Sequence, residues 1–444
     1  MKTFFKYLLV LCLALPTVGL AQHFALPKGQ KVQKVRFELI NNLMIIPMEV
    51  NGAKLSFILD SGVNKPLLFS LSDQDSIQLN NVSEITIKGL GEGEPLKALR
   101  SRGNVFELKN IRNFNQQLYV VLDKSMNFSP TLGIPIHGII GYDLFRDFVV
   151  DINYNTKVIK FYDPQYYKPK PSKKSQTLPI SIVKNKSYLQ GKVALNGKKD
   201  IPVKLLVDTG SSDAVWLFKD SIRGIGIPEK YYDDFLGKGL NGDIFGKRTK
   251  LNNITIGDFV LNDAKAAFPN MASFSAVKDL GDRNGSVGGE VLKRFNIVFN
   301  YPKNEITLRK NGGFNKPFHY NMSGIELQHN GLRYIAERIA DSRGVVKNDE
   351  EAFGNVQILL ENRTRLSLVP EIVVSGIRAG SPAAEAGLKE GDVVLAVNGK
   401  RIHEYKLQEI MKMINEREGK KIRLLIERYN KDLLFSFVLK EVFK

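Results

Sequence analysis

Cysteine is almost absent from the sequence, because Cys12 is the only one among 444 residues. It lies in a short apolar run, Tyr7–Leu15, which follows two lysines and precedes the small-residue site Gly19-Leu20-Ala21. This arrangement is typical of a secretory signal peptide and predicts one over residues 1–21. Cys12 would be removed with it, which excludes disulfides and thiolate chemistry from the mature chain.

Long apolar segments are missing too, because no stretch after the signal approaches the roughly 20 apolar residues of a membrane-spanning helix. We therefore expect an exported protein of bacterial type, periplasmic or secreted, with no transmembrane segment once the signal is removed. The five histidines lack the spacing of metal ligands. Neither a metal site nor a cofactor is predicted.

The net charge of +18 reflects an excess of basic residues. The lysines are scattered and are not interleaved with aromatic residues, which argues against nucleic acid as a partner. A solvated basic surface is the simplest interpretation. Attraction to an anionic envelope surface or to acidic substrates is the alternative.

The chain contains an internal repeat. The segment Leu55–Gly62, which ends in Asp-Ser-Gly, is echoed by Val203–Gly210, which ends in Asp-Thr-Gly, and the two aspartates lie 148 positions apart. Each copy follows an apolar segment and an Asn-Gly pair, at Asn51-Gly52 and Asn196-Gly197. An Asn-Gly pair between two apolar runs predicts a β-hairpin in each copy.

The repeat continues downstream with nearly the same offset. Gly138–Phe145 corresponds to Gly285–Leu292, and each is followed by a tail that predicts two strands joined by a tight turn. Alternating apolar residues and frequent turn signals make each half mainly β, with a short helix expected after the second glycine of each element. Two unrelated turn aspartates would not reproduce this shared context.

A third unit follows the repeats. Ser381–Asp392 predicts a short helix ended by Gly387 and then a tight turn, and an amphipathic helix is expected over Leu407–Ile414. Paired strands are predicted over 422–426 and 433–439. The predicted organisation is a signal peptide (1–21), a first half (22–167), a charged, proline-rich linker (168–176), a second half (177–313) and a C-terminal α+β domain (317–444).

The two Asp-Ser/Thr-Gly loops in matching contexts resemble those of retropepsin- and pepsin-like aspartic proteases, over about residues 34–312. The resemblance implies two half-barrels that form a bilobal unit, with Asp60 and Asp208 as the catalytic pair. Two adjacent carboxyls share one proton, so that one can take a proton from water while the other gives one to the peptide carbonyl. No metal or covalent nucleophile is needed for this hydrolysis.

The resemblance also implies supporting roles around the aspartates. Ser61 and Thr209 would brace the loops by hydrogen bonds to the opposite half, and Gly62 and Gly210 would permit close backbone approach. Lys65 departs from the family pattern, where a small residue is commoner, and could disturb the charge of the pair. No flap tyrosine is evident; the glycine-rich segments Gly89–Gly93 and Gly237–Gly242 are candidate flaps, with plain loops as the alternative.

The third unit resembles PDZ domains of bacterial envelope proteases, through Ser381-Pro382-Ala383-Ala384 and the Gly387-Leu388-x-x-Gly391-Asp392 pattern. The resemblance implies peptide or protein partners and a C-terminal peptide ligand. Its carboxylate would be held by backbone N–H groups beside a strand edge. The residues assigned to that site are Met322, Ser323, Gly324, Ile325, Leu407 and Ile410.

These observations together predict an exported aspartic endopeptidase with a peptide-recognising PDZ domain. Two alternatives remain: a catalytically inactive peptide binder that keeps the protease fold, and a scaffold built around the PDZ domain. Retention of both aspartates, each beside a hydroxyl residue and a glycine, favours the enzyme, because a peptide binder needs no paired acids.

Overall fold

The computed structural model of the chain describes residues 23–69, 77–123, 125–170, 172–275, 280–340, 345–346, 358–359 and 362–443. They fall into two compact units. The larger unit holds the described residues up to Asn127, then Ile136–His319 and Phe443; the smaller unit holds Tyr320–Val442 together with Phe128–Pro135. The predicted signal peptide, 1–21, lies outside the described residues.

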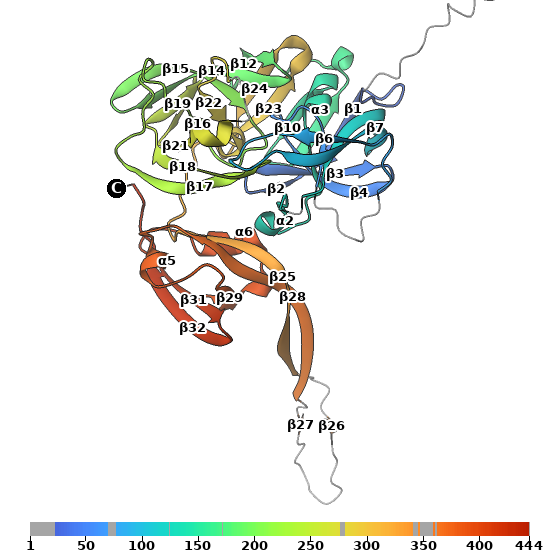
Figure 1. Cartoon of the computed structure of the whole chain (residues 1–444). Coiled ribbons are helices and arrows are strands. Elements are labelled where there is room, and N and C mark those ends of the chain that lie inside the picture. The colour runs from blue at the N-terminus through green and yellow to red at the C-terminus, as the bar shows by residue number, and fades with distance from the viewer. Residues whose placement is uncertain are drawn as a thin grey trace, which may run out of the picture. The chain divides into compact units, whose positions relative to one another are not determined.

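The first half is built on the predicted hairpin of β3 (Leu43–Val50) and β4 (Ala53–Leu59), drawn in blue in Figure 1. Asn51 and Gly52 connect the strands with φ of 48° and 88°, the left-handed pair that a two-residue hairpin turn requires. These strands belong to a sheet in the order β2-β3-β4-β9-β5-β8-β7-β6. Its other members are β2 (Glu38–Ile40), β5 (Leu67–Leu68), β6 (Ser83–Ile87), β7 (Leu96–Leu108), β8 (Ile111–Val121) and β9 (Gly138–Ile140).

The second half repeats this plan. Asn196 and Gly197, with φ of 52° and 75°, join β14 (Lys186–Leu195) to β15 (Lys198–Val207). The sheet runs β17-β18-β21-β16-β22-β15-β14-β19-β20, with β13 (Ser181–Val183) on β14. Its other strands are β16 (Val215–Leu217), β17 (Tyr231–Gly239), β18 (Gly242–Lys250), β19 (Asn253–Ile256), β20 (Phe259–Asn262), β21 (Lys265–Pro269) and β22 (Gly285–Val287), and η2 (Met271–Phe274) follows β21.

Each hairpin ends beside a short strand that runs parallel to it. β9 pairs in parallel with β4, and β22 pairs in parallel with β15. The predicted short helices follow directly, as α3 (Tyr142–Asp147) and α4 (Gly289–Leu292), which confirms this part of the prediction. The parallel crossing places the two Asp-Ser/Thr-Gly loops at the ends of β4 and β15.

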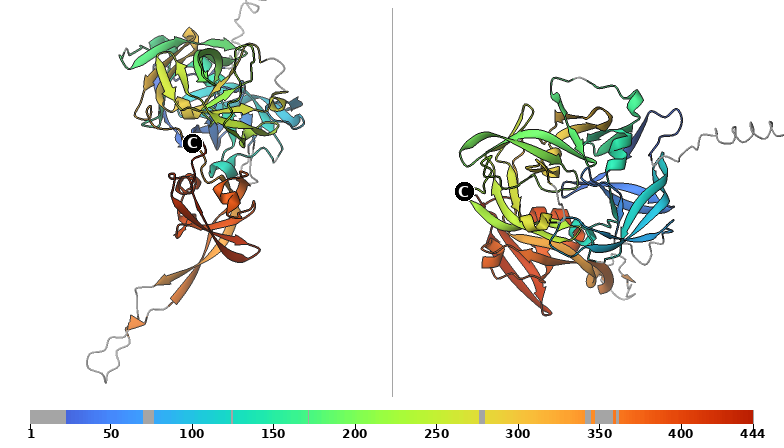
Figure 2. Two further views of the ribbon diagram at one scale, coloured as in Figure 1. Left: turned by 90° about the vertical axis from the view of Figure 1, so that its left-hand side faces the viewer. Right: turned by 45° about the horizontal axis from the view of Figure 1, so that its top comes forward.

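The tails of the halves combine into one sheet, in the order β1-β11-β10-β23-β24-β12. At its centre β10 pairs antiparallel with β23, so that Val150 lies opposite Phe299. Figure 2 shows the first half, in blue to teal, beside the second half, in green to gold. The members are β1 (Val32–Arg36), β10 (Val149–Asn153), β11 (Val158–Tyr162), β12 (Ser175–Pro179), β23 (Phe295–Asn300) and β24 (Glu305–Lys310), with η1 (Pro164–Tyr166) and η3 (Tyr301–Lys303) nearby in the chain.

The smaller unit contains a sheet in the order β25-β28-β29-β31-β32, with β30 on β29. β25 (Ile325–Ala340) and β28 (Asn362–Ile377) are unusually long and pair as a ribbon that extends beyond the rest of this sheet (Figure 1). This ribbon accounts for part of the extra length after Asn330. The remaining elements are β26 (Val345–Val346), β27 (Ile358–Leu359), α5 (Pro382–Glu385), β29 (Val393–Val397), β30 (Lys400–Arg401), η4 (Ile402–Glu404), α6 (Leu407–Met413), β31 (Lys421–Arg428) and β32 (Lys431–Val438).

Several predictions for this unit are confirmed. The helix predicted from Leu407 is α6, and β31 pairs with β32, with Ile422 opposite Phe437. Ser381 caps α5 by accepting a hydrogen bond from the amide of Ala384 at 3.3 Å. The sequence did not indicate that α2 (Ser129–Leu132), which lies between β8 and β9 in the chain, would group with this unit.

Candidate active site

Asp60 and Asp208 lie where β4 and β15 end. The amide of Asp60 donates to the carbonyl of Ile140 at 2.8 Å, and the amide of Asp208 donates to the carbonyl of Val287 at 3.0 Å. The parallel pairing of β4 with β9 and of β15 with β22 therefore fixes both loops in the same way. The two carboxyls lie close enough that the charge of Asp208 helps to raise the pKa of Asp60.

Ser61 and Thr209 tie the two loops together. The amide of Ser61 donates to the hydroxyl of Thr209 at 2.9 Å, and the amide of Thr209 donates to the hydroxyl of Ser61 at 3.1 Å. Each hydroxyl then donates across to a strand-end carbonyl, Ser61 to Val207 at 2.6 Å and Thr209 to Leu59 at 2.8 Å. Both side chains are buried. We call these four reciprocal bonds the brace.

Gly62 and Gly210 allow the carboxyls to approach one another. Their amides donate to the aspartate two residues earlier, at 2.6 Å for Gly62 and 3.1 Å for Gly210. A Cβ on Gly62 would lie 3.1 Å from Asp60 Oδ1 and 3.3 Å from Asp208 Oδ1, and one on Gly210 would overlap the Asp60 carboxyl. No side chain could be added to Gly210 without displacing the pair.

The surroundings of the pair favour one bound proton. Burial, and then the charge of Asp208, raises the pKa of Asp60 from its ordinary 3.8 to about 7. The amide of Gly62 and the positive charge of Lys186 act in the opposite direction but are outweighed. Two adjacent carboxyls titrate as a unit, so the pair keeps one proton over a wide range below neutral pH.

Lys65, which the sequence placed near the pair, has a carboxylate partner of its own. Its ammonium lies 3.8 Å from Asp143 Oδ1, and Arg146 lies 3.1 Å from the same oxygen. Gln116 donates to the other oxygen of Asp143 at 2.8 Å. The positive charge of Lys65 is therefore balanced by a buried carboxylate in α3.

The two glycine-rich segments meet, and Asn241 joins them. The backbone of Asn241 accepts from Gly93 at 2.6 Å and donates to Leu90 at 2.8 Å. Its side chain accepts from the amide of Gly89 and donates to the carbonyl of Glu94 at 2.5 Å. We call this set of contacts the latch. It joins the β6–β7 connection of the first half to the β17–β18 turn of the second.

Other residues at this junction had no signal in the sequence. Ser273 accepts from the amide of Gly91 at 2.9 Å through its carbonyl and donates to Glu92 at 3.1 Å through its hydroxyl. Leu90 packs on an apolar cluster of the second half. The buried members of that cluster are Trp216, Phe218, Leu236, Ile244, Ala267 and Phe274. The glycine-rich segments occupy equivalent positions in the two halves, which indicated flaps. Nothing in their sequence indicated that they would contact Ser273 or this apolar cluster.

Comparison with known families gives the same division of the chain. The aspartyl protease family matches residues 46–144 and again residues 191–289, so each match contains one Asp-Ser/Thr-Gly loop and its parallel partner strand. The PDZ domain family matches residues 373–428. The chain carries two aspartyl protease segments and a PDZ domain. The larger unit is called the protease unit below, and the smaller one the PDZ unit.

Among solved structures, the chain is similar to the crystal structure of the aspartic proteinase from Irpex lacteus. The sequence identity is 13% and the TM-score is 0.40, over 64% of this chain and 98% of that one.

The residues assigned to peptide binding in the PDZ unit lie where β25 and α6 begin. Met322, Ser323 and Gly324 lead into Ile325, the first residue of β25. Leu407 and Ile410 of α6 are 3% and 0% exposed and belong to the PDZ core. Ile410 therefore packs inside the PDZ unit, and Leu407 also lies beside Gly133.

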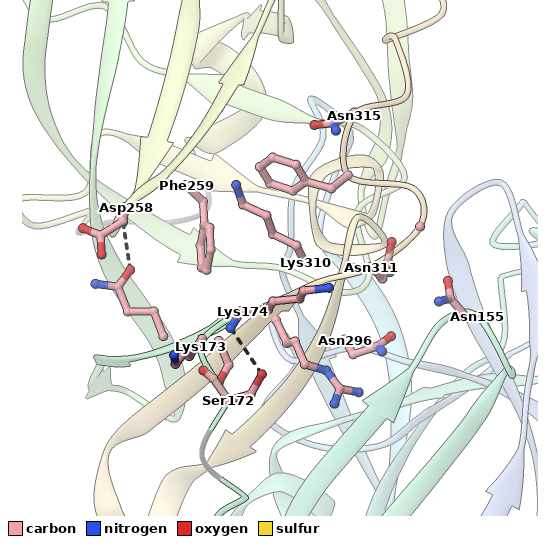
Figure 3. A pocket seen from close by; sticks show the side chains of 15 residues that line it. Asn155, Ser172, Lys173, Lys174, Asp258, Phe259, Asn296, Lys310, Asn311 and Asn315 are labelled. Carbon is pink, nitrogen blue, oxygen red and sulfur yellow. Dashed lines mark hydrogen bonds between the residues drawn. The ribbon is translucent and has the colours of Figure 1, made fainter.

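A pocket of about 890 Å³ lies elsewhere on the protease unit (Figure 3). Lys310 lies 5.4 Å from the ring centre of Phe259 within it. Neither Asp60 nor Asp208 lines this pocket. Its lining comprises Asn155, Ser172, Lys173, Lys174, Ser175, Gln176, Asp258, Phe259, Asn296, Arg309, Lys310, Asn311, Gly312, Phe314 and Asn315.

Among the residues that the structure describes, no helix is both long and apolar enough to cross a membrane. The same residues include no group of three or more His, Cys, Asp or Glu side chains that could hold a metal ion.

Proposed function

We propose that the chain is an exported aspartic endopeptidase that hydrolyses peptide bonds with water activated by Asp60 and Asp208. Export is inferred from the predicted signal peptide over residues 1–21. The PDZ unit would recognise a peptide segment of a protein substrate. No metal or other cofactor takes part in this proposal.

The observation that carries the proposal is the braced carboxyl pair. The brace fixes the two loops through buried groups, and oxygens of both carboxyls lie beside Gly62. A peptide binder gains nothing from this arrangement, because two adjacent buried carboxyls destabilise the folded protein whenever both ionise.

The mechanism follows from the shared proton. Asp60, whose pKa is raised to about 7, holds the proton and donates it to the oxygen of the scissile carbonyl. Asp208 accepts a proton from the attacking water, which adds to the carbonyl carbon. Asp208 then gives its proton to the amine nitrogen as the C–N bond breaks, and a hydroxyl of the tetrahedral intermediate returns a proton to Asp60, so the pair again holds one proton.

The flaps would contribute by excluding water from the site. In the structure they are joined by the latch above. A substrate would have to pass between the flaps. The latch would therefore have to open when substrate binds and again when product leaves.

The test is cleavage of a denatured protein by the purified chain beginning at Gln22. Asp60→Asn and Asp208→Asn should each lower kcat by about a thousandfold or more, because either amide removes the shared proton. Asp258→Asn, at an exposed position, is the matched control and should retain full activity. Absence of cleavage by the parent chain over pH 3–8 on a broad panel of substrates would favour the peptide-binder alternative.

A further inference from the structure

The PDZ unit contains a segment that comes from the middle of the first protease half. Phe128–Pro135 follows β8 and precedes β9 in the chain, yet it groups with Tyr320–Val442 in one compact unit. Its helix α2 contacts β25. The segment therefore forms part of the PDZ unit, although it lies within residues 46–144, which match the aspartyl protease family.

The segment lies at the edge that PDZ domains use for peptides. β25 is an outer strand of its sheet and pairs only with β28 among the described residues. β25 also contacts α6. We call Ile325–His329 together with α6 the peptide-binding edge, because PDZ ligands lie beside such a strand, opposite the helix.

Specific contacts hold the segment at one end of this edge. Gln408 of α6 donates its side-chain amide to the carbonyl of Leu132 at 2.7 Å. A Cβ built on Gly133 would lie 3.0 Å from Leu407 Cβ and 3.6 Å from His329 Nε2. Leu132 is only 4% exposed. One residue of β25 and two of α6 therefore contact the same two positions of the segment.

The regular part of the edge stops at this same place. The register of β25 shifts between His329 and Leu332, where Gly331 has a φ of 83°. Two residues there oppose one on β28, which is a bulge and bends the strand. A ligand strand could pair only as far as His329, and the segment already covers that end.

The other end of the edge is not equipped to hold a terminal carboxylate. The amide of Ser323 donates to Asn415 at 2.9 Å, and the amide of Gly324 donates to Asn321 at 2.9 Å. The amide of Ile325 donates to the hydroxyl of Ser323 at 3.2 Å. All three N–H groups that would bind a carboxylate thus already have acceptors inside the protein, and these would have to be displaced.

We propose that Phe128–Pro135 is a built-in ligand of the PDZ domain, and that the peptide-binding edge recognises internal apolar segments of this kind in preference to free C-termini. A substrate segment reaches the edge by displacing the built-in one. The inference rests on the peptide recognition proposed above for the PDZ unit, but not on catalysis.

The binding test uses the full chain carrying Asp208→Asn, so that the probe is not cleaved. The probe is a peptide with the sequence of residues 128–135, labelled with fluorescein at its amino terminus and amidated at its carboxyl terminus. Leu132→Asp should release the built-in segment and tighten probe binding about tenfold, because the competing bound form is lost. Thr131→Asp adds the same charge at an exposed neighbour and should change affinity less than twofold.

The same assay tests the class of ligand. The probe with a free carboxylate should bind within about twofold of the amidated probe, because the loop amides are already bonded. A preference of more than tenfold for the free acid would overturn the inferred specificity. Unchanged affinity in Leu132→Asp would overturn the built-in ligand. Absence of binding by both chains would refute peptide recognition at this edge, and leave the catalytic proposal standing.

Disulfide trapping provides an independent measurement, because the chain after residue 21 contains no cysteine. Cβ atoms at positions 133 and 407 would lie 3.0 Å apart, slightly closer than the 3.5–4.5 Å of a disulfide, so a small outward shift of the segment allows the bond. The Gly133→Cys/Leu407→Cys chain should cross-link on mild oxidation and lose probe binding until it is reduced. Gly133→Cys/Leu434→Cys, with the second cysteine on exposed β32, should not cross-link. Equal cross-linking of both pairs would contradict the proposal.

Discussion

Five residues after its aspartate, the first protease half has Lys65, whereas the second has Asp213. The partner position in the following helix is Asp143 in the first half and Glu290 in the second. In the first half the two positions form a pair of opposite charge, 3.8 Å apart. In the second half both are acidic, and positive charge must come from strands elsewhere.

Arg248 and Lys265 provide that charge. Arg248 donates to Asp213 at 2.7 Å, and Lys265 lies 2.5 Å from Glu290. Burial opposes ionisation of Asp213, but these two cations outweigh it and lower its pKa. The comparison teaches that the duplicated loop geometry does not depend on one particular set of buried charges. Each half surrounds the residues that follow its loop with a different set of buried ion pairs.

The largest effect on folding should come from Arg248→Met. It would leave Asp213 and Asp234 without their main partner in a buried site, which destabilises a protein by about 3 kcal/mol. Lys65→Met should cost about 1 kcal/mol or less, because Asp143 keeps Arg146 and Gln116. Urea unfolding of the two variants measures the difference. Equal losses would mean that the halves rely on their buried charges to the same degree.

A second prediction concerns stability and pH at the carboxyl pair. Because the pKa of Asp60 is raised from 3.8 to about 7, the folded chain binds more protons than the unfolded chain between these values. Stability should therefore fall as pH rises from about 4 to 7. Asp60→Asn removes this titration and should stabilise the protein at pH 7 by on the order of 2 kcal/mol.

The measurement is denaturant unfolding of the parent and Asp60→Asn at pH 4, 5.5 and 7. The difference between the two chains should become small at pH 4, where folded Asp60 is protonated and unfolded Asp60 is about half protonated. A variant that is less stable than the parent at pH 7 would show that the Asp60 carboxylate is stabilising, contrary to the burial argument.

The brace should respond equally to changes in either half. Ser61→Ala and Thr209→Val each remove one hydroxyl and leave one strand-end carbonyl and one amide without a partner. Each should destabilise the protease unit by about 1–2 kcal/mol, and the double variant should lose less than the sum because the four bonds are reciprocal. Additive losses in unfolding experiments would show that the two hydroxyls act independently.

The smallest effect is expected at the latch, and it should be kinetic. Asn241→Ala removes the two side-chain bonds but keeps the two backbone bonds. Looser flaps should change KM and kcat by a few fold, through binding and release, without altering the pH profile set by the carboxyl pair. Asn270→Ala, on the same half, is the control, because its side chain makes no cap bond at η2. A shifted pH profile in Asn241→Ala would assign this residue a role in the chemistry instead.

Much of the protease fold could be predicted from the sequence, because each of its local signals occurs in both copies of the repeat. The Asn-Gly hairpins, the short helices after Gly141 and Gly288, and the PDZ pattern around Gly387 are local signals, and local signals specify local structure. The pairing of Asp60 with Asp208 needed only the assumption that two equivalent loops meet. The matches to the aspartyl protease and PDZ families confirm the division of the chain into two protease segments and a PDZ domain.

The rest depends on partners far apart in the chain. Lys65 was expected to affect the pair, but nothing local indicates Asp143, 78 positions later, as its partner. In the sequence Asn241 looks like an ordinary turn residue. Only the structure shows that its side chain hydrogen-bonds to Gly89 and Glu94 of the first half. The amides of Ser323–Ile325 look free in the sequence, because their acceptors include Asn415, 92 positions later in the chain. Periodicity cannot reveal such long-range contacts.

The pairing of β10 with β23 has a consequence for synthesis of the chain. β10 ends at Asn153, but its partner β23 begins only at Phe295, so roughly 140 residues must be made before this edge can close. At about 5–20 residues per second, the ribosome needs about 7–30 s to make that stretch. During this time the first half presents an open strand edge, which invites pairing with other chains. A nascent chain of this length would benefit from a chaperone that covers β10 until the second half arrives.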